Sequence, residues 1–241
     1  MVISILNQKG GAGKTTLAIH IAMALAQDAQ ASGAARVLLV DADQQGSALD
    51  WSGSRANAAA HEGADASPDV LGFPVIGLPK ATIHRELPKL VKDYDYIVID
   101  GPPRVYDVTR SAILASDLVL IPVQPSPYDV WAAKEIVDLV REASAFNENL
   151  KCAFVINRKI VNTAIGRDVS EALGGYELAI LKSHISQRVG FAESAGQGQT
   201  VLETAPSSTA SEEIRALVQE LKEFAQTSTT PQETSSKELS S

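Results

Sequence analysis

The sequence predicts an α/β fold in which one mostly parallel β-sheet carries helices on both of its faces. Short apolar runs alternate along the chain with segments of helical periodicity, and several of these runs end in acidic or polar residues. Strands covered on both faces show such continuous apolar runs, because helices bury both sides of a parallel sheet. The 241 residues contain no visible internal repeat and are enough for one domain with a sizeable core. A single domain is therefore expected.

Strands are expected where an apolar run is short and ends at a turn. Five runs meet this description: VISIL at 2–6, RVLLVDAD at 36–43, YDYIVIDGPP at 94–103, SDLVLIPVQPSP at 116–127 and CAFVIN at 152–157. The region 51–79 is rich in Ala, Gly and Pro and has a poor period. A helix followed by loops is expected there, with a short edge strand around 73–76.

Helices are expected where apolar residues recur at helical spacing. The segment TTLAIHIAMALAQ places four of them on one face: Leu17, Ile21, Ala24 and Leu25. The segment ATIHRELPKLVKDY does the same with Ile83, Leu87, Leu90 and Val91. Pro88 is expected to kink or split that second helix, because proline removes a helical hydrogen bond.

A last helix is expected near the C-terminal end of the predicted domain. Thr209 and Glu212 have the spacing of a capping box. The apolar stripe that follows comprises Ile214, Leu217, Val218, Leu221 and Phe224. Residues 1–226 are predicted to form the domain, and the polar stretch 227–241 is predicted to be a disordered tail.

Composition and charge exclude several classes of protein. No apolar run approaches the ~18–20 residues that span a bilayer, and the N-terminus does not have the pattern of a secretory signal. The lone Cys152 excludes a disulfide framework and a cysteine-ligated cluster built within one chain. The net charge of −8 argues against nucleic-acid binding as the dominant property, although screening still permits a local basic patch. A soluble protein of a reducing cytoplasm is expected.

The stretch NQKGGAGKT at 7–15 predicts a phosphate-binding loop between a strand and a helix, hence a single-domain P-loop NTPase. Its glycines let backbone N–H groups turn toward an anion, and the helix N-terminus adds positive potential. Lys14 would reach the β- and γ-phosphates, and the Thr15 hydroxyl would bind Mg²⁺. In the ordinary pattern G-x-x-x-x-G-K-[ST] a glycine would stand at position 8, where this chain has Gln8 beside an additional lysine, Lys9. The cradle residues are Gly10, Gly11, Ala12, Gly13, Lys14 and Thr15.

Carboxylates follow two of the expected strands. Asp41 and Asp43 leave the run RVLLVDAD at its C-terminal end, where α/β sheets bind ligands, and Asp100 closes YIVID. A metal–triphosphate site needs carboxylates to hold the metal shell and to orient the attacking water. Asp100 is therefore predicted to serve the metal.

Three motifs resemble those of the ParA/MinD family of partition and cargo-positioning ATPases. KGGAGKTT at 9–16, VLLVDADQQG at 37–46 and YIVIDGPP at 96–103 resemble its deviant Walker A, switch I and Walker B motifs, in family order. The similarity runs from Met1 to about Phe224. The short N-terminus resembles the small ParA subgroup, which includes ParF-like partition ATPases, and McdA-like carboxysome-positioning ATPases share the same core. One departure is Gln44, which replaces the proline of the family's switch I.

The resemblance implies roles for individual residues. Lys9 matches the signature lysine that reaches across an ATP-sandwich dimer to the partner's phosphates, so it would make dimerisation depend on ATP. Asp43 would position or activate the hydrolytic water, and Asp41 would support the metal shell. Thr16 would contact the α-phosphate, and Asn157 would contact the purine. The implied cofactors are ATP and Mg²⁺.

The resemblance also implies partners. ATP-dependent homodimers would bind nucleoid DNA non-specifically through cations of the C-terminal part, and we expect these to be Arg158, Lys159, Lys182 and Arg188, with Arg188 the preferred contact. A cargo-bound adaptor, ParB-like or McdB-like, would stimulate slow hydrolysis. The cargo would be a plasmid, a chromosome region or a protein body such as a carboxysome. The expected location is the cytoplasm, on the nucleoid and off the membrane.

Two other functions stay open at this point. A MinD-like membrane-associated regulator would need a basic amphipathic C-terminal helix, whereas SEEIRALVQELKEF is acidic. A metabolic P-loop ligase is a further alternative, while iron–sulfur carriers need paired cysteines that the chain lacks. Trp51, Tyr128 and Trp131 are expected to be packing residues, and the four histidines show no metal-ligand spacing.

Overall fold

A computed structural model describes residues 1–32, 35–61, 72–160 and 165–227 of the chain. Within these residues, one seven-stranded sheet has the order β3-β2-β4-β1-β5-β6-β7, and each neighbouring pair is parallel. The strands are β1 Val2–Ile5, β2 Val37–Asp41, β3 Val75–Gly77, β4 Tyr96–Asp100, β5 Leu118–Val123, β6 Lys151–Lys159 and β7 Ala179–Ser186. The predicted α/β fold with a parallel sheet is confirmed.

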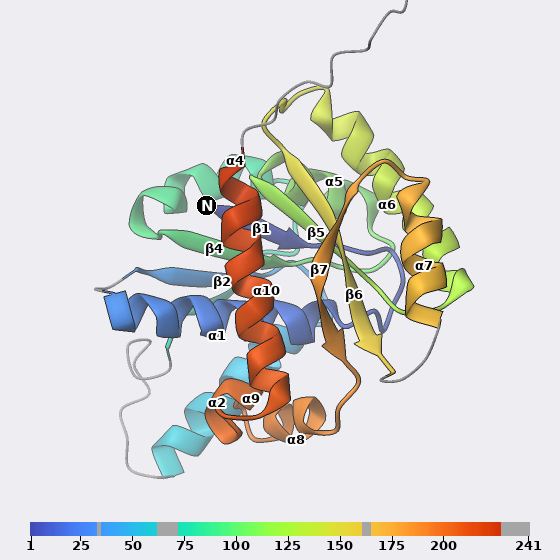
Figure 1. Cartoon of the computed structure of the whole chain (residues 1–241). Coiled ribbons are helices and arrows are strands. Elements are labelled where there is room, and N and C mark those ends of the chain that lie inside the picture. The colour runs from blue at the N-terminus through green and yellow to red at the C-terminus, as the bar shows by residue number, and fades with distance from the viewer. Residues whose placement is uncertain (33–34, 62–71, 161–164, 228–241) are drawn as a thin grey trace, which may run out of the picture.

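Helices cover both faces of this sheet (Figure 1). One face packs against α1 Lys14–Ser32, α2 Ser47–His61, α8 Gly190–Gly196, α9 Val201–Thr204 and α10 Thr209–Gln226. The other packs against α4 Ile83–Leu90, α5 Tyr106–Leu114, α6 Pro127–Ser144 and α7 Ile165–Gly174, and a 3₁₀ helix, η1, covers Val91–Asp93. In Figure 1, α1 and α10 cross the near face of the sheet.

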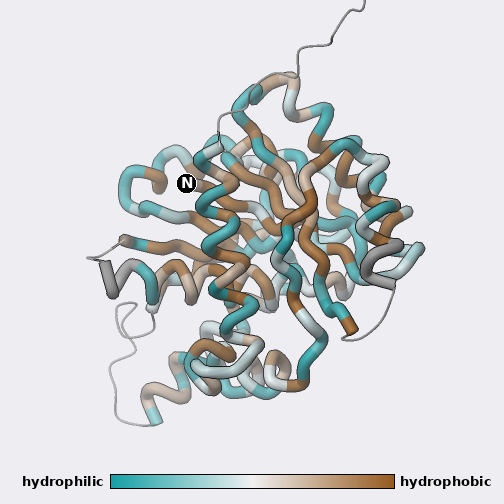
Figure 2. The backbone as a smooth tube through the Cα atoms, viewed as in Figure 1, coloured by the Kyte–Doolittle hydropathy of each residue, from teal (hydrophilic) through white to brown (hydrophobic). Residues whose placement is uncertain are grey.

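The apolar runs form strands because alternate residues bury against opposite helix layers. In β1, Ile3 and Ile5 belong to the core beneath α1 and α10, whereas Val2 belongs to the core beneath α5 and α6. Figure 2 shows the resulting apolar centre of the molecule along the strands. The edge strand predicted around 73–76 is present as β3. The strand β7 was not expected, because its half-buried sequence AILKSHIS lacks a continuous apolar run.

The site is positioned by the carboxyl ends of β1, β4 and β2, which lie side by side. Asp100 pairs in register with Ile5 of β1 and with Asp41 of β2, so the ends of the three strands reach the same edge of the sheet. Gly101 continues β4 under the loop that follows β1. A Cβ atom at Gly101 would lie 2.2 Å from Leu6 Cδ2 and 3.1 Å from the Ile5 carbonyl oxygen, so a side chain there would have to displace Leu6.

Some details of the predicted helices differ in the structure. Of the two predicted effects of Pro88, a split does not occur, because α4 continues to Leu90 before the 3₁₀ turn begins; the predicted kink stays a prediction. Pro88 is exposed, so the carbonyl that loses its helical partner can bond to water. The buried stripe of this helix consists of Ile83 and Leu87, and Val91 is exposed in the 3₁₀ turn.

The capping box predicted at Thr209 and Glu212 is also wrong by one residue. Ser208 is the N-cap of α10, and its Oγ accepts a hydrogen bond from the Ser211 amide. The spacing rule missed it because two adjacent hydroxyl residues can each serve as the N-cap. The complete capping box in this part of the chain starts α9, with Thr200 and Glu203. The predicted apolar stripe of α10 is buried except for Phe224, which is partly buried.

The predicted packing role of the aromatic residues holds for Trp51 alone. Trp51 is buried and stacks on Phe73 at 5.9 Å between ring centroids. Tyr128 and Trp131 are exposed on α6, because its inward face is taken by smaller apolar side chains. Cys152 is buried, and burial raises the pKa of its thiol to about 12. Residues 228–241 of the predicted tail lie outside the described residues.

Candidate functional site

The loop between β1 and α1 has the conformation that its glycines permit. Gly11 and Gly13 have φ values of +76° and +87°, a region that side-chain-bearing residues rarely adopt. At Gly13 a Cβ atom would lie 2.3 Å from Asn157 Nδ2, so this position also lacks room for a side chain. Around Gly10 and Gly11 the space is open. Within the described residues, the backbone amides of 10–13 donate no hydrogen bond, which suits a loop that receives an anion.

Polar side chains from neighbouring strands hold this loop from outside. Asn157 at β6 donates to the Ala12 carbonyl at 2.7 Å, and Gln124 after β5 donates to the Gly11 carbonyl at 2.8 Å. Asn7 donates to the Pro122 carbonyl at 2.7 Å and accepts from the Lys9 amide at 2.8 Å. These hydrogen bonds tie the Gly11 and Ala12 carbonyls to residues at the ends of β5 and β6. Asn157 is buried, and its amide group serves the loop in this structure.

The two lysines of the loop occupy different places. Lys14 is buried, and its ammonium group donates to the Lys9 carbonyl at 3.1 Å. Burial lowers the pKa of Lys14, while Asp100 and Asp43 raise it. Lys9 instead points to α6, where its ammonium group lies 2.6 Å from Asp129 Oδ2.

Asp129 is a site residue that the sequence analysis missed. Its side chain is 1% exposed, against 36% for Lys9, and its second carboxylate oxygen has no hydrogen-bond partner within the described residues. The contact with Lys9 joins residues 120 positions apart, so no local pattern could have indicated it. The one available signal was an acidic residue in the first turn of a helix that follows a strand.

Asp100 lies beneath the loop as a buried carboxylate; in the described part of the chain neither of its oxygens has a partner at full hydrogen-bond geometry, and the Thr15 hydroxyl is its polar neighbour. Burial raises its pKa to about 7; Thr15 and Lys14 lower the value, and Asp41 and Asp43 raise it. Carboxylate and hydroxyl oxygens are ligands that Mg²⁺ prefers. The orphaned oxygens of Asp100, with Thr15 beside them, therefore fit the predicted metal.

Asp41 and Asp43 differ in how they are engaged. Both oxygens of the buried Asp41 accept backbone hydrogen bonds, at 3.1 Å from Asp43 and at 2.9 and 3.1 Å from Ala48 and Leu49 in the first turn of α2. Burial raises the pKa of Asp41, and these amides lower it. Asp43 is half-buried and accepts from the Gln45 amide at 3.0 Å. Asp41 thus anchors the loop that carries Asp43, and the metal and water roles of the two residues remain predictions.

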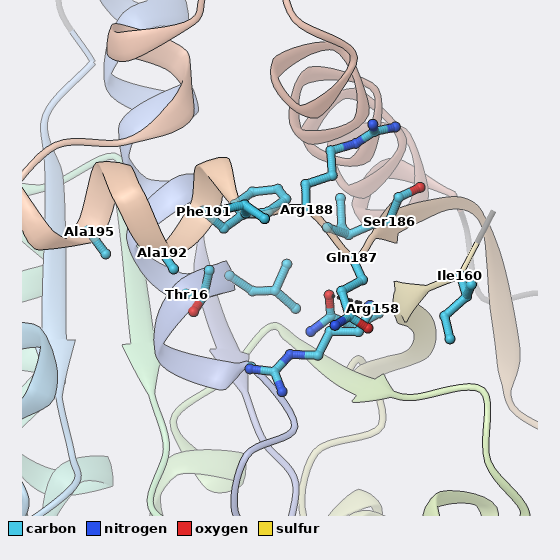
Figure 3. A pocket seen from close by; sticks show the side chains of 14 residues that line it. Thr16, Arg158, Ile160, Ser186, Gln187, Arg188, Phe191, Ala192 and Ala195 are labelled. Carbon is cyan, nitrogen blue, oxygen red and sulfur yellow. Dashed lines mark hydrogen bonds between the residues drawn. The ribbon is translucent and has the colours of Figure 1, made fainter.

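A cavity of about 920 Å³ opens beside the loop, between the first turn of α1, the ends of β6 and β7, and α8. Figure 3 shows Thr16 entering it from α1 and Phe191 from α8. Gly13 and Asn157 also line it, so the cavity continues from the phosphate loop. This is where a nucleoside attached to loop-bound phosphates has room. Thr16 and Asn157 both line this cavity, and their contacts with a nucleotide stay predictions.

The four cations predicted to contact DNA do not form one cluster. Arg158 and Arg188 line the cavity, whereas Lys182 lies within β7 and is not part of its lining. Arg188 forms an ion pair with Glu213 of α10 at 3.0 Å, and Figure 3 shows its side chain directed away from Thr16. Arg158 is exposed, and Lys159 pairs in register with Ser186. DNA binding remains a prediction.

The fold and this site define a nucleotide-binding protein of the P-loop class. Residues 3–201 match the family of CobQ/CobB/MinD/ParA nucleotide binding domains, and the chain belongs to this family. The family membership predicted from the three motifs is thereby confirmed.

Named relatives and a solved structure cover nearly the whole chain. The chain is 28% identical over 224 residues to the maintenance of carboxysome distribution protein A of Halothiobacillus neapolitanus, covering 91% of this chain and 95% of that protein. It is 30% identical over 244 residues to the chromosome-partitioning ATPase Soj of Thermus thermophilus, covering 91% and 94%. A putative plasmid partition protein of Borrelia burgdorferi, solved with AMPPNP, has the same fold, with a TM-score of 0.70, 23% identity, and coverage of 92% and 98%. Within the described residues, the structure has no helix that could cross a membrane.

Proposed function

We propose that this protein is a ParA-type ATPase that forms ATP-dependent sandwich dimers and positions a cargo on the nucleoid. The dimer binds DNA non-specifically. A cargo-bound adaptor, ParB-like or McdB-like, stimulates the slow hydrolysis of ATP, so that the dimer opens and releases the DNA. Relatives named for carboxysome distribution and chromosome partitioning support this class of function. The cargo is a plasmid, a chromosome region or a protein body such as a carboxysome.

ATP and Mg²⁺ are the proposed cofactors. The free amides of residues 10–13 and the buried Lys14 are the groups that would hold the phosphates. Thr15 and Asp100 would hold the metal. Asp41 would support the metal's ligand shell indirectly, by anchoring the loop that carries Asp43. Asp43, which remains half-buried at the open side of the site, would orient the attacking water. When bound, Mg²⁺ supplies charge neutralisation on the phosphates.

The position of Lys9 carries the proposal of a dimer. Lys14 already occupies the space beneath the loop, so Lys9 is a second cation at its outer edge, held by Asp129 of α6. ATP carries about four negative charges, and one lysine with Mg²⁺ leaves part of them uncompensated. A cation donated by a neighbour is most effective in the water-excluded space that dimer closure creates. Lys9 is the cation available for that donation.

Lys9→Ala tests this function directly. The variant is expected to bind a non-hydrolysable ATP analogue through the remaining loop groups but to lose analogue-dependent dimers, as measured by isothermal calorimetry and sedimentation velocity. The control is Lys92→Ala, which removes an exposed lysine at η1, before the amino end of β4 and away from the loop. Dimer formation by Lys9→Ala at the wild-type level would contradict the proposed role.

DNA binding is proposed to depend on ATP through the doubling of a weak cationic surface. Exposed Arg158 is the strongest candidate contact, because Arg188 is paired with Glu213. Arg158→Ala is expected to weaken binding to all sequences alike and to reduce the slope of log affinity against log salt by about 1. Fluorescence anisotropy across a salt series, with ATP and without it, measures both effects. Equal DNA affinity with and without ATP would contradict the proposal that DNA binding depends on the ATP-dependent dimer.

The membrane-associated alternative is disfavoured by the packing of α10. Its apolar residues Ile214, Leu217 and Leu221 are buried against the sheet and α1, so this face is not available to lipid. Sedimentation with anionic liposomes and ATP decides this point. A metabolic ligase would be stimulated by a small-molecule substrate, whereas the proposed function requires stimulation by DNA and an adaptor protein.

A further inference from the structure

Two large aromatic side chains are exposed on the first turns of α6. Tyr128 is 71% exposed and Trp131 is 67% exposed, and their ring centroids lie 5.4 Å apart in an edge-to-face arrangement. Farther along the helix the outward residues are charged: Lys134, Glu135, Asp138, Arg141 and Glu142. The exposed apolar surface of this helix face is thus concentrated in the Tyr128–Trp131 pair, at the end of α6 nearest the phosphate loop.

The pair lies beside the outer edge of that loop. Asp129, between the two aromatic residues in sequence, is buried and holds the Lys9 ammonium group at 2.6 Å. Gln124, just before α6, donates to the Gly11 carbonyl at 2.8 Å. One contact from the first turn of α6 and one from the segment just before it therefore join this region to the loop.

Two large aromatic side chains that are exposed side by side can serve as an anchor for an interface. A buried Trp or Tyr contributes roughly 150–250 Å² of contact area, and these residues are enriched at the centres of protein interfaces. The edge-to-face contact orders the two rings before any partner arrives, which reduces the entropy lost on binding. The Tyr128–Trp131 pair therefore has the character of an interface anchor.

We propose that the Tyr128–Trp131 pair is covered by a second copy of this chain in the nucleotide-bound dimer. This inference rests on the proposed function, in which Lys9 reaches a neighbour's phosphates. The Lys9 ammonium group now contacts Asp129. Because the lysine side chain can swing only about its own Cα atom, any phosphate that Lys9 can reach lies within about twice the length of that side chain from Asp129. A neighbour that brings its nucleotide so close also approaches the aromatic residues flanking Asp129. In a two-fold dimer the same burial occurs on both protomers.

Tryptophan fluorescence offers a direct test, because the chain has two tryptophans and Trp51 is buried. Acrylamide quenching, corrected with a Trp131→Phe variant that reports Trp51 alone, measures the accessibility of Trp131. On adding a non-hydrolysable ATP analogue and Mg²⁺, the quenching constant of Trp131 is expected to fall at least twofold in parallel with dimer formation. Sedimentation velocity on the same samples gives the dimer fraction.

Substitution provides the second arm of the test. Trp131→Ala is expected to raise the dimer dissociation constant at least tenfold, while binding of the analogue to the monomer is unchanged. Trp131→Phe should retain most of the dimer. The control is Phe146→Ala, which removes a side chain that is equally exposed but lies beyond the far end of α6.

The outcomes separate this inference from the proposed function. A wild-type protein that remains monomeric with the analogue overturns both. A dimer in which Trp131 is quenched as strongly as in the monomer overturns the inference alone and leaves this surface to a different protein. A third outcome also overturns the inference: Trp131 becomes less accessible to acrylamide as the protein concentration rises, although no nucleotide is present. The contact would then not belong to the nucleotide-bound dimer.

Discussion

At the scale of single residues, the environment of His20 determines its protonation state. Its Nδ1 lies 2.7 Å from the Thr16 carbonyl, and its Nε2 lies 3.2 Å from the Val201 amide. The carbonyl requires N–H at Nδ1 and the amide requires a lone pair at Nε2, so the neutral ring satisfies both partners. Burial lowers the pKa of His20 to about 4 from its ordinary value of 6.5.

His20 is therefore expected to make folding stability depend on pH. Below about pH 6.5 the unfolded chain binds a proton that the folded chain does not accept until about pH 4. Stability is thus fully present above pH 6.5 and falls by ~3 kcal/mol as the pH falls through this window. Urea unfolding at pH 7, 6 and 5 measures the loss, and His20→Gln removes the titrating group. Parallel stability curves for the two proteins would show that His20 does not titrate as described.

The pairing of Lys9 with Asp129 predicts an effect on dimer formation. The buried carboxylate must release Lys9 before that lysine can reach a neighbour, and this separation costs free energy. Asp129→Asn removes the charge but keeps an oxygen acceptor, so it is expected to strengthen the analogue-dependent dimer about tenfold, or ~1.4 kcal/mol.

Sedimentation velocity across a protein concentration series measures the change caused by Asp129→Asn. The control is Asp138→Asn, which removes an exposed partner of Lys134 and should have little effect. A weaker dimer in Asp129→Asn would mean that Asp129 keeps a necessary contact in the dimer.

At the scale of elements, α2 connects the loop that carries Asp43 to the α8–α9 region. Asp41 binds the first turn of α2, and farther along Trp51 donates to the Gln199 carbonyl at 3.2 Å. Arg55 forms an ion pair with Glu203 at 2.6 Å. These contacts hold α2 against residues that follow α8, the helix that lines the cavity. A displacement of α2 would therefore be expected to shift both the loop that carries Asp43 and the α8–α9 region.

Gly198 is expected to be the most sensitive position in this contact. It has a φ of +66°, and a Cβ atom there would lie 2.4 Å from the backbone nitrogen of Arg55. Gly198→Ala should reduce the free energy of unfolding by ~2–4 kcal/mol, measured by urea denaturation. Gly196→Ala is the control, since a Cβ atom there meets nothing within 4 Å, and its effect should stay within about 0.5 kcal/mol. Equal stability of the two variants would refute the close approach.

The elements show why some predictions from the sequence succeeded. Continuous apolar runs identify β1, β2, β4, β5 and β6 because each is buried on both faces. The half-exposed β7 lacks that signal. The predicted split at Pro88 and the predicted cap at Thr209 were wrong, because tolerance of a proline and the choice between adjacent caps depend on solvent exposure and local geometry.

At the scale of the whole molecule, the site is assembled from segments that are distant in the sequence. Local motifs were sufficient to place the glycine-rich loop and Asp100 at the same edge of the sheet, because each lies at the end of a recognisable strand, and their roles stay predictions. The groups that hold the loop, Gln124 and Asp129, were not predictable, because their contacts depend on the order of β1, β5 and β6 in the sheet. The same dependence explains why the four predicted cations are dispersed: Arg158 and Arg188 line the cavity, whereas Lys159 lies on β6 and Lys182 on the edge strand β7.

The proposed ATP-dependent dimerisation follows from this assembly. Lys9 and the Tyr128–Trp131 pair lie at the same edge of the proposed nucleotide site, with Asp129 in α6 as their common neighbour. Sedimentation velocity of the wild-type protein with Mg²⁺, in the presence and absence of a saturating non-hydrolysable ATP analogue, tests this dimerisation most directly. We expect a monomer without nucleotide and a dimer of about twice the 25.5 kDa chain mass with the analogue. A protein that remains monomeric under saturation would contradict the account.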